Sequence, residues 1–66
     1  MKLLEQWHGG RYSVILWQPS ERKFEVTIYS NKDQHDHISE EFPGRNLAGK
    51  CFVKWINKAR NLDKKK

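Results

Sequence analysis

Two strand-like stretches decide the fold, Arg11-Tyr-Ser-Val-Ile-Leu-Trp-Gln18 and Lys23-Phe-Glu-Val-Thr-Ile-Tyr-Ser30. Both are rich in β-branched and aromatic residues, which favour strands. The segment 19–22 between them opens with a proline, a residue suited to a turn. In the second stretch apolar residues occupy every other position from Phe24 to Ile28, so one of its faces is expected to be buried. Together the two stretches predict an antiparallel β-hairpin.

The turn determines which side chains of this hairpin share a face. A two- or four-residue loop centred on Ser20-Glu21 pairs Trp17 with Phe24, because the register of a hairpin follows from its loop. The expected core face then consists of Ile15, Trp17, Phe24, Val26 and Ile28. The opposite face is expected to expose an apolar patch, a candidate interface formed by Tyr12, Val14, Leu16 and Tyr29.

A helical pattern follows the strands. Apolar residues between Ala48 and Leu62 recur at three- and four-residue spacing, which predicts a helix over residues 45–61 with one wide apolar stripe. Pro43-Gly44 breaks the chain before this helix, and Asn46 is expected to cap its first turn. The stripe is expected to pack on the core face of the hairpin.

The remaining segments are less regular. His35–Phe42 is expected to supply a short third strand, whereas residues 1–10 allow either an extra strand or a short helical turn. We therefore predict an α+β fold, a three-stranded antiparallel sheet packed on one face by a C-terminal α-helix. Its 66 residues form one small domain, with an N-terminal segment (1–10), the sheet (11–42), the helix (45–61) and a basic tail (62–66).

Composition excludes several classes of protein. The longest unbroken apolar run, Val14–Trp17, is four residues, too short to cross a bilayer. The charges near Met1 leave no long apolar stretch for an export signal. A single cysteine, Cys51, cannot form an internal disulfide, which favours a reducing compartment. We expect a cytoplasmic protein with no membrane partner.

The charge is concentrated at one end of the chain. Residues 45–66 hold eight Lys/Arg and one Asp, a net charge of +7. Residues 1–44 hold five Lys/Arg and seven Asp/Glu, a net charge of −2. Cations along a helix can track phosphates, or they can simply keep a solvated face soluble. The candidate nucleic-acid-binding residues are Arg45, Lys50, Lys54 and Lys58, with Tyr12 and Tyr29 as stacking groups.

No arrangement of residues indicates an enzyme. Serine–histidine–aspartate sets, glycine-rich phosphate loops and paired carboxylates are all missing from the sequence, so we expect no catalytic residues and no cofactor. His35 and His37 would share one side of a strand and could chelate a metal, but a zinc site needs three or four ligands. We therefore expect no metal site. Cys51 is expected to be a small apolar filler of the core.

The order of strands and helix along residues 11–60 matches a known topology. The matching positions are Tyr12-Ser-Val14, Pro19, Phe24-Glu-Val26-Thr-Ile28, Phe42, Ala48 and Trp55-Ile56. In this order the chain resembles the three-stranded DNA-binding domain of plant ethylene-response factors, and the arm-binding domains of phage integrases are similar. The resemblance implies a sheet face that reads the DNA major groove through arginines and tryptophans. Here the expected outer positions are instead Val14, Leu16, Glu25 and Thr27.

The start of the helix resembles a second family. Strands followed by Arg45-Asn-Leu-Ala-Gly-Lys50 are similar to the end of the double-stranded-RNA-binding domain, in which lysines at the start of the last helix grip phosphate. Together these features predict a small non-enzymatic module that binds DNA or RNA through the basic helix face. The alternative is a module that binds another protein, or a second copy of itself, through the apolar outer face of the sheet.

Overall fold

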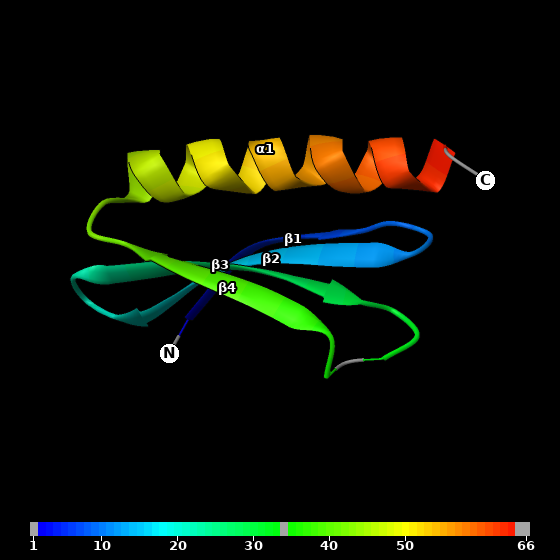
Figure 1. Ribbon diagram of the computed structural model, residues 1–66. Helices are drawn as coiled ribbons and strands as arrows, with labels where there is room; N and C mark the ends of the chain where they lie inside the picture. Colours follow the sequence, from blue (N-terminus) through cyan, green and yellow to red (C-terminus); the bar gives the residue numbers. More distant parts are fainter. Residues whose placement is uncertain (1, 34, 65–66) are drawn as a thin grey trace.

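The structure is a computed structural model that describes residues 2–33 and 35–64. Four strands precede one helix in the chain, and the strands form a single antiparallel sheet in the order β1-β2-β3-β4. Their bounds are β1 Lys2–His8, β2 Tyr12–Ser20, β3 Lys23–Ser30 and β4 His37–Phe42, followed by α1 Arg45–Lys64. The helix lies along one face of the sheet (Figure 1). The predicted α+β class, with one C-terminal helix on an antiparallel sheet, is confirmed.

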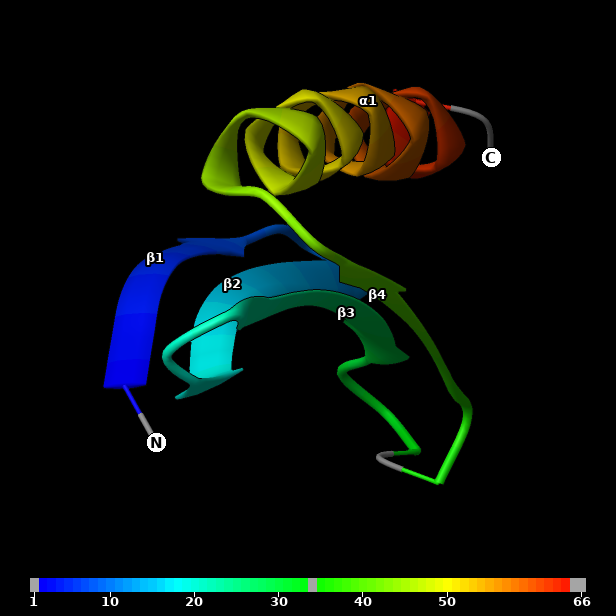
Figure 2. The same cartoon turned by 90° about the vertical axis from the view of Figure 1, so that its left-hand side faces the viewer.

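The sheet has four strands rather than the predicted three. The additional strand is β1, which comes from the N-terminal segment that the sequence left open between a strand and a helical turn. It pairs with β2 because Leu4 and Trp7 can then pack against the core from the edge of the sheet. Figure 2 shows that the sheet is arched, with its convex side under α1 and with β1 and β4 bending away at its two edges.

The predicted register of the hairpin is wrong by one residue. Trp17 pairs with Glu25 and Leu16 with Val26, whereas the sequence analysis paired Trp17 with Phe24. The chain turns at Glu21-Arg22, and the register shifts between Trp17 and Ser20. This irregularity contains Pro19, which has no N–H to contribute to a ladder and is tolerated at a bulge. A shift of one residue moves every side chain of β2 to the other face.

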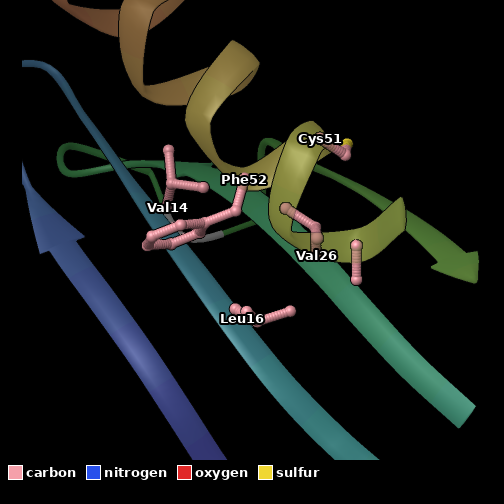
Figure 3. Close-up of a cluster of buried hydrophobic side chains, with 6 residues drawn as sticks. Val14, Leu16, Val26, Cys51 and Phe52 are labelled. Carbon is pink, nitrogen blue, oxygen red and sulfur yellow. The ribbon is translucent and has the colours of Figure 1, made fainter. Parts of the chain in front are cut away.

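The core therefore contains the opposite face of β2 from the one predicted. Val14 and Leu16, expected in a solvent-facing patch, are 0% and 2% exposed beneath the helix. In Figure 3, Phe52 reaches down from α1 to lie beside Val14. The buried cluster consists of Val14, Leu16, Val26, Ala48, Cys51 and Phe52. The β3 half of the predicted core is confirmed, since Phe24, Val26 and Ile28 all pack in or against this cluster.

The hairpin between β1 and β2 is fastened to two distant segments. Asp63, near the end of α1, accepts hydrogen bonds from the backbone N–H groups of Gly10 (3.0 Å) and Arg11 (2.9 Å). Asn31, after β3, donates through Nδ2 to the carbonyl oxygens of Gly9 (2.8 Å) and Gly10 (3.2 Å). These bonds tie the first hairpin to the end of the helix and to the loop before β4.

Gly9 is required by the close approach of its neighbours in this hairpin. A Cβ atom at this position would lie 2.5 Å from the Trp7 ring and 2.8 Å from the carbonyl oxygen of Tyr12. Both distances are shorter than a carbon atom tolerates, and the Tyr12 oxygen is also the acceptor for the Gly9 N–H at 2.9 Å. A side chain here would displace Trp7 from the core.

The helix ends differ slightly from those predicted. The break at Pro43-Gly44 is confirmed, but the carbonyl of Gly44 already accepts from the N–H of Ala48 at 3.2 Å. Asn46 therefore lies inside the first turn and is not the N-cap. At the other end the helix continues through the expected tail to Lys64, because Asp63 is held by the first hairpin. Within the described residues, no helix has the length and apolar character needed to cross a membrane.

Candidate binding surfaces

The four predicted phosphate-binding cations are all exposed on α1, but they do not form one straight row. Arg45 and Lys50 line a hollow on the β1 side of the helix, together with Glu5 of the sheet. Lys58 lines a different groove on the β4 side. Lys54 lies between them and shares a shallow surface with Lys58. Because four residues exceed one helical turn of 3.6, the row Lys50, Lys54 and Lys58 drifts diagonally across the solvent side of the helix.

The groove on the β4 side is an apolar feature beside one of these cations, Lys58. Its volume is about 380 Å³, and its walls come from the helix, from the sheet and from the start of β4. Trp55 and Tyr12 contribute aromatic rings to it, and Lys58 contributes a cation. Ile38 of β4 lines the same groove and is 63% exposed. The groove thus combines flat apolar surface with the cation Lys58, and Asp36 and His37 line it as well.

The two predicted stacking groups lie on opposite faces of the sheet. Tyr12 is on the helix side, where it shares the groove with Lys58. Tyr29 pairs with Ser13 and His37, and it projects to the face away from α1. The structure therefore brings Tyr12 together with the helix cations and separates Tyr29 from them.

The predicted interface of Tyr12, Val14, Leu16 and Tyr29 does not exist as one surface. Val14 and Leu16 are buried, Tyr12 lies in the groove, and only Tyr29 remains on the far face, which we define as the sheet face away from α1. The register shift places Ile15 and Trp17 there instead. The far face also carries Gln6, His8, Ser13, Glu25, Thr27, His37, Ser39 and Glu41.

Side-chain hydrogen bonds cross the far face. Ser13, 1% exposed, donates its hydroxyl to Asn31 Oδ1 at 2.6 Å and lies 3.2 Å from Nδ1 of His8. Since the serine has one proton and gives it to Asn31, His8 must be the donor in the second bond. Thr27 and Ser39 form a further hydroxyl pair at 2.8 Å. The His8–Ser13–Asn31 chain fixes a turn, and it leaves Ser13 without access to a substrate.

Trp17 on the far face has a buried donor that lacks an acceptor among the described residues. Its Nε1 is buried and has no hydrogen-bond partner within residues 2–33 and 35–64. An indole N–H is a donor only, and it usually finds an acceptor when it is buried. A sequence-based register could not have found this feature, because it placed Trp17 in the core.

The histidine pair does not adopt the spacing expected of two residues on one strand. His35 lies in the loop before β4, where its N–H donates to Asp33 Oδ1 at 3.0 Å, and His37 is the first residue of the strand. Among the described residues no three His, Cys, Asp or Glu side chains are grouped so that they could hold a metal ion.

Cys51 lies where the sequence analysis expected it, in the core. It is 9% exposed, and its Sγ donates to Glu40 Oε2 at 3.9 Å. Burial raises the pKa of the Cys51 thiol, and the neighbouring Glu40 carboxylate raises it further, while Lys54 acts in the opposite direction. A thiol with a raised pKa is a poor nucleophile at neutral pH.

Comparisons with known proteins add no relative: no protein-family model, no curated protein and no solved structure matches the chain. The resemblances in the sequence are therefore limited to topology, an antiparallel sheet followed by a C-terminal helix. The N-terminal segment is a strand, whereas the double-stranded-RNA-binding domain begins with a helix. The positions compared with the DNA-reading face also divide, since Val14 and Leu16 are buried while Glu25 and Thr27 lie on the far face.

Proposed function

We propose that this protein is a small non-enzymatic module that binds nucleic acid through the solvent side of α1. The observation that carries the proposal is the separation of charge, +7 over residues 45–66 against −2 over residues 1–44. The candidate contacts Arg45, Lys50, Lys54 and Lys58 are all exposed, so their ammonium and guanidinium groups are free to meet phosphates.

The groove beside Lys58 favours a single strand over a duplex. Tyr12 and Trp55 line this groove, and aromatic rings beside a cation provide a stacking surface for an unpaired base. A base in the groove would leave its phosphate near Lys58 and the next phosphates near Lys54 and Lys50. Tyr29 takes no part in this arrangement, because it lies on the far face.

Fluorescence anisotropy with labelled single-stranded RNA, single-stranded DNA and duplex DNA tests the proposal. With four phosphate contacts, we expect the logarithm of the binding constant to fall with the logarithm of salt concentration at a slope of about −3. The triple variant Lys50→Gln/Lys54→Gln/Lys58→Gln should bind weakly, with the magnitude of its slope reduced by about two, because the Arg45 contact remains.

A matched variant separates a local contact from net charge. Lys2, Lys23 and Lys32 are exposed and lie outside the helix, so replacing all three with glutamine changes the net charge by the same amount. This control should keep most of the affinity and most of the salt slope. Equal losses in the two triple variants, or no binding to any of the three nucleic acids at about 50 mM salt, would contradict the proposal.

The far face supports a second candidate function, binding of another protein. Ile15, Trp17 and Tyr29 lie on this face, which the helix leaves uncovered, and the Trp17 indole N–H has no acceptor in the part of the chain that the structure describes. Aromatic residues of this kind are enriched at protein interfaces, where the ring is buried and the N–H is satisfied. A photo-cross-linking residue at Gln6, beside Ile15, should capture a partner that the same residue at Asn57 on α1 does not. If the Trp17→Ala variant still captured the same partner protein at Gln6, the result would argue against protein binding through the far face.

A further inference from the structure

The two edges of the sheet differ in regularity. At one edge, β1 is interrupted by a register shift between Leu3 and Glu5, and such a bulge hinders pairing with another strand. At the other edge, β4 pairs with β3 without interruption from Phe42 to His37. The helix packs mainly on β2 and β3, and residues 37–41 of β4 are all exposed. The regular edge strand β4 contains neither the lysine nor the proline that often protects an edge.

The direction of the free backbone groups follows from one hydrogen bond. The N–H of Ser30 donates to the carbonyl of Asp36 at 3.0 Å, so the backbone of Asp36 faces β3. In an antiparallel ladder, successive residues point alternately toward and away from the paired strand. The N–H and C=O groups of His37, Ser39 and Glu41 therefore point outward from the edge, and they are available for another strand.

We propose that β4 pairs with β4 of a second copy of this chain, antiparallel and centred on Ser39. In this register Ser39 faces Ser39 of the second copy, and His37 of each copy faces Glu41 of the other. All three outward-pointing residues then take part in hydrogen-bonded pairs. The two four-stranded sheets become one continuous sheet, with both helices on the same side.

Charge selects this register over its neighbour. His37 and Glu41 project from the far face, and when they lie opposite each other an imidazole N–H can donate to a carboxylate at both ends of the contact. Another register that also pairs outward-pointing residues is centred on Glu40. It places the Glu40 carboxylates of the two copies directly opposite each other, which is unfavourable. On the helix side, the exposed Ile38 side chains of the two copies become diagonal neighbours at roughly 7–8 Å, within reach of each other.

Sedimentation of the whole chain at increasing concentration tests the association. Wild-type protein should shift from monomer to dimer between micromolar and millimolar concentration. Ser39→Pro removes the outward N–H at the centre of the contact while leaving the β3–β4 ladder intact, so this variant should remain monomeric. Ser39→Ala loses the same hydroxyl bond to Thr27 but keeps the N–H, and it should dimerise like the wild type.

Disulfide trapping tests the register and does not depend on the proline variant. In a Cys51→Ala background, Ser39→Cys places two thiols on directly opposed residues about 5.5 Å apart at Cα, a distance that a disulfide spans. Ser39→Cys should therefore oxidise to a covalent dimer much faster than Glu40→Cys. Equal or faster trapping at position 40 would overturn the register.

A wild-type chain that remains monomeric at millimolar concentration would overturn the proposal and would leave this edge to an extended segment of another protein. A dimer that Ser39→Pro leaves unchanged would also overturn the proposal. Ile38 belongs both to the dimer contact and to the groove proposed for a base, whereas Arg45, Lys50 and Lys54 on α1 lie outside the dimer contact. Ser39→Pro therefore tests dimerisation, and the triple lysine variant tests nucleic-acid binding, so that each proposal can fail without the other.

Discussion

The two faces of the sheet are stabilised by different forces. Under α1, Val14, Leu16 and Val26 are almost fully removed from water against an apolar helix stripe, so burial dominates. On the far face, side-chain hydrogen bonds link neighbouring strands and turns, as in the Ser13–Asn31 pair. Strand β2 has apolar residues on both of its sides. The side that carries Leu16, which pairs with Val26, becomes part of the core, and the other side faces away from the helix.

A large difference in stability is expected between variants on the two faces of β2. Leu16→Ala should lower the free energy of unfolding by about 2–5 kcal/mol, because it opens a cavity beneath the helix. Ile15→Ala, one residue away on the far face, should cost about 1 kcal/mol. Chemical denaturation of the two variants provides the measurement. Equal losses would mean that the far face is covered as completely as the helix face.

Lysine at position 16 or 15 of β2 should separate the two faces by an even larger difference in stability. Leu16→Lys buries an ammonium group under α1, and we expect this chain not to fold. Ile15→Lys leaves the charge at the far face and should fold, as judged by circular dichroism. A folded Leu16→Lys protein would instead support the register in which Leu16 faces solvent.

The sequence predicted correctly where an apolar pattern repeated along one element. The alternation of Phe24, Val26 and Ile28 identified the buried face of β3, and the spacing of the apolar residues identified the helix and its stripe. Both patterns repeat with the period of one element, so no other part of the chain is needed to interpret them.

The main errors arose at the turn of the hairpin and where a distant contact decides the outcome. The register of β2 depends on an irregularity near Pro19. Because β2 has apolar residues on both of its faces, its sequence does not indicate which face is buried. Asp63 extends the helix into the expected tail because it binds the backbone of Gly10 and Arg11, more than fifty residues away. The basic residues lie on the helix surface, as predicted. The apolar patch was predicted from the wrong register, and its residues lie partly in the core and partly on opposite faces of the sheet.

A polar deletion should affect the far face most. Asn31→Ala removes two donors to the Gly9 and Gly10 carbonyls and leaves the buried hydroxyl of Ser13 without its acceptor. We expect a loss of about 1–3 kcal/mol in the free energy of unfolding, because a buried polar group becomes unsatisfied. Lys32→Ala is the control: this neighbour is exposed, and its loss should be within about 0.5 kcal/mol. If the two variants were equally stable, the hydrogen bonds of Asn31 to the first hairpin would contribute nothing to the free energy of unfolding.

The smallest expected effect is on the helix side, at the thiol of Cys51. Its pKa is raised from the model-compound value of 9.0, first by burial and then by the carboxylate of Glu40. The folded chain therefore prefers the neutral thiol. This contribution to stability is complete below the pKa of the unfolded chain, and it is lost as pH rises through the higher folded pKa. Above about pH 9 the folded protein should lose stability by an amount that is absent in Cys51→Ala.

Alkylation of the thiol separates the causes of this shift, because only the thiolate reacts. Native protein should react with iodoacetamide more slowly than unfolded chain at the same pH. Glu40→Gln removes one cause of the raised pKa and should speed the reaction, whereas Lys54→Gln removes the opposing charge and should slow it. These opposite responses distinguish electrostatics from loss of packing, since a loosened core would speed alkylation in both variants. A rate unchanged by Glu40→Gln would show that the Cys51–Glu40 contact at 3.9 Å is absent in solution.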